Sequence, residues 1–280
     1  MKFCFVSIDI ESDFAKGKGF LGVENIEKIL KLLEGFGIPA TLFVTGNVLE
    51  KYRNKFKNLS GSYEIACHSF SHRYWNELGR DKRQEELRKF ILLYKEIFEN
   101  APSGFRAPSH VIDEDGLKLL EENKFLYDSS VVPNYPFFKT YRGFKGRAVS
   151  EPYQPSNLDY RKAGGMNILE IPVSGLMLGV PVAGTWIRKL PFFVYQYLLL
   201  PNTPKFLAVS LHSWDSLSQK TLEKAAKLLK ILKDKNFEFL NGLQVYEKFS
   251  KNKNQRRPEI LELRSETRSQ ELELETLAAS

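Results

Sequence analysis

The stretch Phe3-Cys-Phe-Val-Ser-Ile-Asp-Ile-Glu11 decides the fold that we expect for this chain. Its aromatic and β-branched residues predict a strand over Phe3–Ile10. Because the side chains of a strand alternate between two faces, Asp9 and Glu11 share one face. Two carboxylates on one face of a central strand are costly unless they bind something, so they indicate a functional site. If the strand has already ended there, both carboxylates are simply solvated.

Strand-like runs alternate with helix-like runs from this first strand to about residue 250. The alternation predicts an α/β fold with a largely parallel sheet, and about seven parallel strands favour a barrel over a small open sheet. Residues 131–165, with four prolines, interrupt it and predict a long loop or a small insertion. Further strands are expected over Ala40–Thr45, Tyr63–Cys67, Gly104–Arg106, Leu126–Ser129, Ile168–Val173, Phe206–His212 and Phe237–Leu240.

The composition is that of an ordinary globular protein. Of the 280 residues, 42% are apolar and 27% charged, with a formal net charge of +7. These values exclude collagenous, disordered and disulfide-scaffold proteins. Cys4 and Cys67 both lie in strand-like runs, so we interpret them as buried apolar residues rather than as a disulfide. The positive charge is spread out, and no basic run with interleaved aromatics precedes the tail, so we expect no nucleic-acid partner.

The apolar segments of the chain bear on its location. The first apolar run is broken by Asp9 and Glu11, so it is neither a signal peptide nor an anchor. Residues 190–200 form the longest apolar stretch, about half of a membrane span. We therefore expect a cytoplasmic protein. Because Arg188 and Lys189 precede this stretch, it could lie near the substrate entrance or make a weak membrane-surface contact, although a buried core helix is the simpler interpretation.

The composition changes near the end of the chain. We expect a catalytic domain over residues 1–250 and a charged tail over residues 251–280. The tail opens with a basic run and continues with alternating Glu, Leu and Arg. Its composition favours a disordered or loosely attached segment, while a short helix and a partner-binding segment stay open as alternatives.

Two of the four histidines in the chain, His68 and His72, are four residues apart. On a helix, or on a turn entering one, residues at this spacing share a face, so both rings can reach one metal ion. A pair of capping or core histidines has the same spacing. The pair directly follows the expected strand Tyr63–Cys67, however, and barrels of this kind carry their sites at the carboxyl ends of strands.

Three more polar residues end successive expected strands. They are Arg106 in Phe105-Arg-Ala-Pro-Ser-His110, Asp128 in Tyr127-Asp-Ser-Ser130, and His212 in Ser210-Leu-His-Ser-Trp214. An arginine there can hold a buried carboxylate through a bidentate pair, although a surface arginine is as common. Five polar sites that each end a strand are harder to explain as structural than any one of them.

Together these motifs resemble the polysaccharide deacetylase family, also called carbohydrate esterase family four or the NodB homology domain. Tyr63–His72 resembles its histidine-pair motif, Phe105–Ser109 its Arg-x-Pro motif, and Leu211–Ser213 its late-histidine motif. The motifs follow in the family's order, and the resemblance covers about residues 3–245.

A narrower resemblance points to the branch of this family that acts in exopolysaccharide and cell-envelope glycan synthesis. Asp9-Ile10-Glu11 resembles the start of that branch. Two later segments, Glu170–Ser174 and Pro181–Arg188, resemble its carboxyl-terminal signature more loosely.

The resemblance implies a distorted (β/α) barrel that removes N-acetyl groups from sugars with a divalent metal. His68 and His72 would be metal ligands. The common motif has two adjacent aspartates, the second on the metal; here Ile10 stands in that place, so Glu11 would be the third ligand. Zinc is the default ion, and Co²⁺, Ni²⁺ or Fe²⁺ also suit such ligands.

The same resemblance implies acid–base roles for the remaining motif residues. Asp9 would be the general base, oriented by Arg106, and His212 the general acid, tuned by Asp128. The residues that we expect to contact the substrate are Arg188, Pro108 and Trp214. A glycan carrying phosphate or carboxylate would need a cation such as that arginine.

Two other functions stay open from the sequence. The same site could hydrolyse another C–N bond, such as a formamide on a lipid-linked sugar or a cyclic ureide, as relatives of this fold do. The chain could also be a non-catalytic glycan-binding protein that kept the fold, although the full set of motif residues argues against this. In the main hypothesis the partner is an N-acetylated sugar or glycan.

Overall fold

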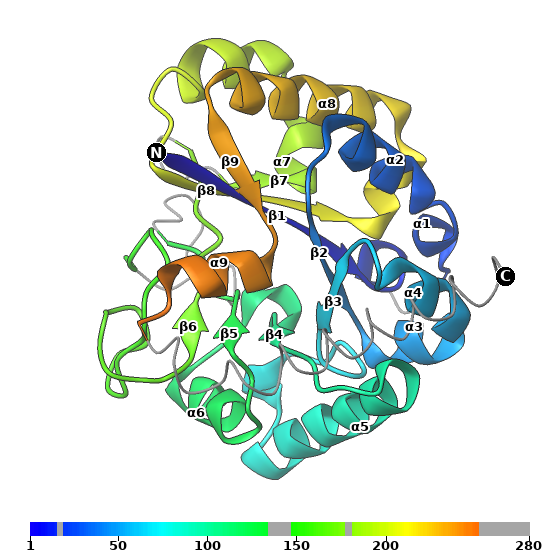
Figure 1. The fold of residues 1–280 in the computed structure, drawn as a ribbon, viewed down its shortest axis with the longest axis vertical. Helices are drawn as coiled ribbons and strands as arrows, with labels where there is room; N and C mark the ends of the chain where they lie inside the picture. The colour runs from blue at the N-terminus through cyan, green and yellow to red at the C-terminus, as the bar shows by residue number, and fades with distance from the viewer. Residues whose placement is uncertain (16–18, 134–146, 177–180, 252–280) are drawn as a thin grey trace, which may run out of the picture. The chain divides into compact units, whose positions relative to one another are not determined.

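The computed structural model describes residues 1–15, 19–133, 147–176 and 181–251 (Figure 1). The chain divides into two units, Met1–Phe249 and Ser250–Ser280. Apart from Lys251, the tail that we expected lies outside the described residues, and so do residues 134–146 of the expected insertion. The properties predicted for these two segments therefore stay predictions.

The described residues contain a parallel sheet of nine strands (Figure 1). Eight follow the order β6-β5-β4-β3-β2-β1-β8-β7, and β9 pairs with β1. Strand β8 pairs along almost all of β1, so β9 and β2 share the other edge of β1, one after the other. The strands are β1 (Lys2–Ile10), β2 (Thr41–Val44), β3 (Glu64–Cys67), β4 (Gly104–Phe105), β5 (Tyr127–Asp128), β6 (Leu169–Glu170), β7 (Val182–Ala183), β8 (Phe206–His212) and β9 (Phe237–Leu240).

This sheet confirms the expected α/β fold and corrects the number of strands, which exceeds seven. Strand β7 is not among the strands expected from the sequence, because a strand of two residues is too short to show a periodic pattern. The helices lie around the outside of the sheet (Figure 1). They are α1 (Leu21–Glu24), α2 (Glu27–Phe36), α3 (Gly46–Lys51), α4 (Arg53–Leu59), α5 (Arg80–Phe98), α6 (Glu114–Glu122), α7 (Gly184–Lys189), α8 (Gln219–Asp234) and α9 (Gly242–Phe249).

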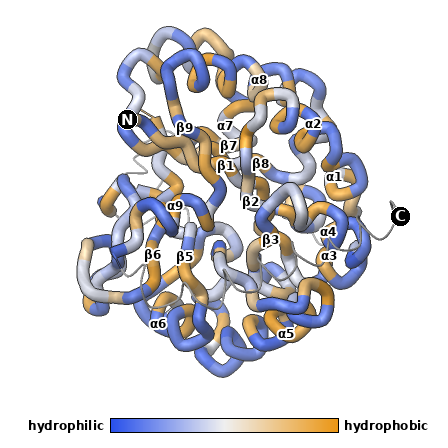
Figure 2. The backbone as a smooth tube through the Cα atoms, in the orientation of Figure 1, coloured by the Kyte–Doolittle hydropathy of each residue, from blue (hydrophilic) through white to orange (hydrophobic). Residues whose placement is uncertain are grey.

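The two faces of β1 explain why a polar site forms inside an apolar fold. Alternate residues of one face are apolar and join the main hydrophobic core; these are Cys4, Val6, Ile8 and Ile10. The other face carries Phe5, Ser7 and Asp9, which the two-residue period of a strand places together. Figure 2 shows the apolar strands surrounded by helices of mixed hydropathy. The polar residues of β1 thus point to the side of the sheet where β4 and β8 bring their own polar groups.

The apolar segment 190–200 is not a simple core helix. It contains a π-helical turn, Val194–Leu199, in which Tyr195 is buried. Phe193 and Tyr197, by contrast, are 59% and 68% exposed. Within the described residues, no helix has the length and apolarity required to cross a membrane.

Candidate metal and catalytic site

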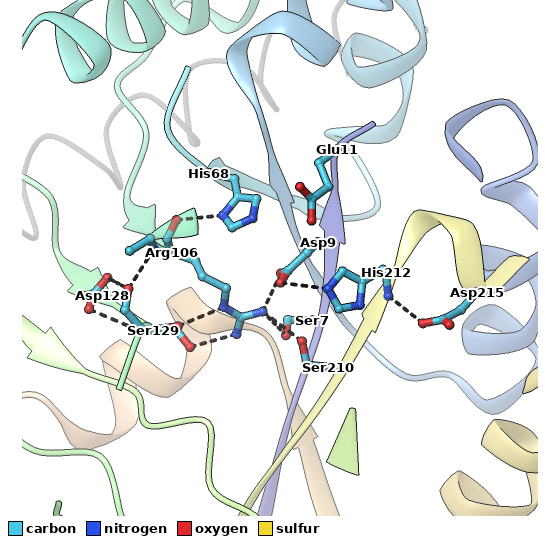
Figure 3. A network of polar contacts seen from close by, with 12 residues as sticks. Ser7, Asp9, Glu11, His68, Arg106, Asp128, Ser129, Ser210, His212 and Asp215 are labelled. Atoms are coloured by element: carbon cyan, nitrogen blue, oxygen red, sulfur yellow. Dashed lines mark hydrogen bonds and ion pairs between the residues drawn. The ribbon is translucent and has the colours of Figure 1, made fainter. Parts of the chain in front are cut away.

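The candidate site forms where the parallel strands β1, β3, β4 and β8 end (Figure 3). Asp9 of β1 lies opposite His212 of β8 in the strand register. His68 and Arg106 each follow the last residue of their strands, and those residues, Cys67 of β3 and Phe105 of β4, are paired. Because parallel strands end at the same edge of a sheet, residues far apart in the sequence meet here.

Glu11, His68 and His72 form a candidate metal site. One ligand atom from each lies within 4.8 Å of the others, and no second group of this kind occurs among the described residues. Glu11 Oε2 is buried and lies 2.5 Å from His72 Nε2. It accepts no hydrogen bond from any other described residue. Three converging ligand atoms, one of them a buried carboxylate oxygen, fit a divalent cation with open positions for water or substrate.

The imidazole of His68 is held in the tautomer that a metal ligand needs. Its Nδ1 lies 2.8 Å from the carbonyl oxygen of Arg106, and a carbonyl can only accept, so Nδ1 carries the proton. The lone pair is then on Nε2. The side chain is only 2% exposed, and this burial lowers the pKa of His68 to about 4 despite the nearby Asp9 carboxylate. The ring is therefore neutral at neutral pH.

The fully buried Arg106 lies at the centre of a polar network (Figure 3). Its Nη1 donates to Asp9 Oδ1 at 2.6 Å, through one nitrogen rather than through the bidentate pair that we expected. The guanidinium also donates to the hydroxyl oxygens of Ser7, Ser129 and Ser210 and to the carbonyl oxygen of Ser129. The guanidinium also lies over the Phe43 ring, 4.2 Å from its centroid.

This network determines the charge of Asp9. Burial alone would raise the pKa of its carboxyl group, but Arg106, followed by His68 and His212, lowers it, and the net pKa lies well below the ordinary range. Asp9 is therefore ionised at neutral pH. Its second oxygen, Oδ2, lies 4.0 Å from His212 Nε2.

His212 is oriented by aromatic stacking and by its backbone. Its ring stacks on Trp214 with centroids 4.3 Å apart and planes 18° apart. Its backbone N–H donates to Asp215 Oδ2 at 2.9 Å. Asp215 Oδ1 in turn accepts from Arg188 Nη1 at 3.3 Å. Arg188, expected to contact the substrate, thus binds a buried carboxylate next to His212.

Asp128, which we expected to tune His212, has other partners in the structure. Its hydrogen bonds run to the hydroxyl and backbone N–H of Ser130 and to the side chain of Glu170, its neighbour in the sheet. Burial raises the pKa of Asp128 to about 6 and that of Glu170 well above its usual range. In the structure Asp128 therefore lies opposite Glu170, and the carboxylate that binds the His212 segment is Asp215.

The expected substrate residues are all partly or fully enclosed. Pro108 is buried at the start of a 3-10 turn, Pro108–His110, and Trp214 is 7% exposed beneath His212. The sequence analysis gave no role to His110, whose pKa is lowered to about 3 by burial and then by Arg106. Asp9 raises the pKa of His110, whereas His68 and His212 lower it further, so His110 lies in the electrostatic field of the site. Its place in the Arg106 motif, in a chain with four histidines, was the available signal.

The fold and this site define a class: an α/β barrel protein with a two-histidine, one-carboxylate site beside an aspartate–arginine pair. Residues 12–127 match the family model for polysaccharide deacetylase. This match covers less than half of the chain and shows that this part of it is similar to the polysaccharide deacetylase family.

Individual relatives agree with the family. The chain is 36% identical to the peptidoglycan deacetylase-like protein of Gibberella zeae over 43% of this chain and 36% of that protein. It is 31% identical to the peptidoglycan deacetylase of Helicobacter pylori over 45% of this chain and 43% of that protein. The match thus spans less than half of each curated relative. A solved Mycobacterium smegmatis structure assigned to the polysaccharide deacetylases shares the fold, with TM-score 0.64, 18% identity, and coverage of 88% of this chain and 90% of that one.

Proposed function

We propose that this protein is a metal-dependent hydrolase that removes N-acetyl groups from an amino sugar or polysaccharide. The observation that carries the proposal is the convergence of ligand atoms of Glu11, His68 and His72 within 4.8 Å. Beside them lies the ionised Asp9, whose Oδ2 faces His212 Nε2. The names of the two curated relatives, both peptidoglycan deacetylases or similar to one, support the same reaction.

The residues around the proposed metal divide the reaction between them. A divalent ion bound by Glu11, His68 and His72, with zinc as the first choice, supplies a Lewis acid for the amide carbonyl and lowers the pKa of water. Asp9, kept ionised by Arg106, accepts the proton of the attacking water. His212 donates a proton from Nε2 to the departing amine nitrogen.

The proposed substrate is a glycan of the cell envelope or an exopolysaccharide, and the proposed location is the cytoplasm. The support for the branch is the resemblance of Asp9–Glu11, Glu170–Ser174 and Pro181–Arg188, three segments outside the family match. The last of these segments supplies two groups beside the Asp215 carboxylate, the buried Gly184 and the half-buried Arg188. A Cβ at Gly184 would come within 1.7 Å of Asp215 Oδ2, so glycine is needed where α7 passes this carboxylate.

Acetate release tests the proposal directly. Purified protein loaded with Zn²⁺ is incubated with N-acetylglucosamine oligomers, peptidoglycan fragments and a lipid-linked N-acetyl sugar, and acetate is quantified. We expect acetate from at least one of them and none after chelation. A lipid-linked formamido sugar and a cyclic ureide are assayed in parallel. Formate release or ureide hydrolysis, without acetate from the N-acetyl substrates, would favour the alternative C–N hydrolase. Glycan binding without any product would favour the non-catalytic alternative.

A further inference from the structure

The loop that carries both histidines, His68–His72, is bound from one side by a carboxylate of α5. Glu86 Oε2 accepts from the Ser69 hydroxyl at 2.9 Å and from the backbone N–H groups of Phe70 and Ser71 at 3.1 and 2.8 Å. Glu86 Oε1 accepts from the Ser71 hydroxyl at 2.8 Å. One half-buried side chain therefore satisfies four donors that lie between the two proposed metal ligands.

The other side of the loop is bound by the start of α3. Gly46 N–H and Asn47 N–H donate to the carbonyl oxygens of Ser69 and Phe70, both at 3.0 Å. A Cβ at Gly46 would come within 2.2 Å of the Phe70 ring, so the glycine lets the loop pack directly on the helix. The backbone of the loop is thus held through its carbonyls by α3 and through its N–H groups by Glu86.

The loop needs such support because its backbone is strained. Ser69 and His72 both have left-handed conformations, with φ of 61° and 60°. A non-glycine residue in this region costs of order 1 kcal/mol or more and persists only where its surroundings enforce it. His72 is itself one of the strained residues, so the direction of its ring depends on the loop keeping this shape.

We propose that Glu86 is a positioning residue that sets the separation and orientation of His68 and His72 for metal binding. The proposal rests on the proposed metal site and adds a residue outside the ligand set. The hydrogen bonds of Glu86 run to Ser69, Phe70 and Ser71, the three residues between the two histidines. Glu86 therefore acts through backbone and hydroxyl groups of the loop. Partners of this kind typically contribute a factor of about 10 to 100 in metal affinity.

Glu86→Gln tests the proposal, with Glu85→Gln as the matched control. Glutamine keeps the size of the side chain but replaces one acceptor oxygen by an N–H₂ group that faces donors. Glu85, the preceding residue on α5, is exposed and pairs with Lys89, so its substitution leaves the loop unchanged. The zinc dissociation constant is measured by competition with a chromogenic chelator, and the melting temperature of each metal-free variant is recorded. We expect Glu86→Gln to bind zinc about 10- to 100-fold more weakly and Glu85→Gln to bind like the unmodified protein.

The readouts separate a positioning role from general stability. A merely structural role for Glu86 lowers the melting temperature and leaves the zinc affinity of the folded protein unchanged, which would overturn the proposal. The Co²⁺-loaded protein adds a spectroscopic readout, because the visible absorption bands of Co²⁺ report on ligand geometry, and we expect Glu86→Gln to alter them. Unmodified protein that binds no metal would instead refute the metal site itself, a different outcome.

Ser71→Ala provides a milder variant in case Glu86→Gln does not fold. It removes one of the four donors and no charge, and we expect zinc binding about threefold weaker, on the scale of one hydrogen bond. If Glu86→Gln folds, unchanged zinc affinity and unchanged Co²⁺ spectra in that variant overturn the proposal. If Glu86→Gln does not fold, the same result in Ser71→Ala overturns it.

Discussion

The two sides of the site are built in different ways. The metal side (Glu11, His68 and His72) is fixed by hydrogen bonds: His68 donates to a backbone carbonyl, and Glu86 binds the loop that carries both rings. The His212 side (His212, Trp214, Asp215 and Arg188) is fixed by ring stacking, one backbone bond and a 3.3 Å contact between charges. Directional bonds position ligands within tenths of an ångström, whereas stacking leaves a ring room to tilt. We therefore expect the metal side to respond to substitution in metal affinity and the His212 side in turnover.

Asp9→Asn tests the separation of the two sides most severely, because Asp9 lies between Arg106 and His212. Asparagine keeps the shape but cannot accept the water proton. We expect turnover to fall by a factor of about 100 or more, while zinc affinity stays close to that of the unmodified protein. Steady-state acetate release and zinc titration of the same preparation measure both quantities.

Glu11→Gln is the counterpart of that substitution on the metal side. It should weaken zinc binding first, with activity partly restored by excess metal. Metal lost in Asp9→Asn and kept in Glu11→Gln would reverse the two assignments. If neither substitution changes metal content or rate, the carboxylates of β1 do not belong to the site.

Trp214→Leu sharpens the comparison by removing the aromatic surface under His212. Leucine fills part of the space but cannot stack on the imidazole 4.3 Å away. We expect turnover to fall about tenfold through misplacement of the acid, with no change in zinc affinity. Phe14→Leu, which removes an exposed ring that also stacks on Trp214 with centroids 5.5 Å apart, is the milder control. Weaker zinc binding in Trp214→Leu would show that the two sides are not separate.

Glu170→Gln probes the buried Asp128–Glu170 pair, away from both sides of the site. The folded pKa values of this pair lie above the unfolded values of about 4, so the folded state binds more protons. The stability that comes from this extra proton binding is thus fully present below about pH 4 and is lost as pH rises through the folded pKa values, that of Asp128 being about 6. The amide of glutamine donates a hydrogen bond at every pH. We therefore expect the free energy of unfolding to fall between pH 5 and pH 9 by about 1 kcal/mol less in Glu170→Gln than in the unmodified protein. Urea denaturation at each pH measures this. The exposed Glu247→Gln is the control, and equal pH slopes in Glu170→Gln and the unmodified protein would contradict the raised pKa values of this pair.

The smallest effect concerns the exposed rings of segment 190–200. Phe193 and Tyr197 are exposed, and cationic Lys189 and Lys227 lie nearby, the latter 5.8 Å from the Phe192 ring centroid. Such a segment favours a weak contact with an anionic lipid surface. We expect partial co-sedimentation with phosphatidylglycerol vesicles and none with phosphatidylcholine vesicles.

The double variant Phe193→Ser/Tyr197→Ser should lose this vesicle binding. Leu158→Ser, at another exposed apolar residue, should keep it. Absence of sedimentation with either lipid would remove the membrane contact.

The sequence allowed prediction of those parts of the molecule that depend on local pattern. The long apolar run of β1 and the periodic helix α8 were predictable because burial imposes a period on many consecutive residues. The histidine pair and the carboxylates of β1 were predictable for a related reason: each ends a recognisable strand. The two-residue strands have no such period, and only motif residues marked β4 and β5.

The partners of the site residues could not be predicted in the same way. Glu86 lies on an otherwise ordinary amphipathic helix, and its role depends on how α5 packs against the loop. The assignment of Asp128 to His212 came from motif position alone, whereas burial beside Glu170 gives Asp128 a different partner. Asp215 adjoins the late-histidine motif, but its bond to the His212 N–H exists only through the turn after β8.

The metal content of purified protein tests the central claim most directly. Elemental analysis and zinc titration are carried out on the unmodified protein, on His68→Ala and on His110→Ala, a histidine in the field of the site but outside the ligand set. The account predicts one zinc per chain in the unmodified protein and in His110→Ala, together with acetate release. It predicts that His68→Ala loses both. Full metal content and full hydrolysis in His68→Ala would place the site elsewhere and contradict the account.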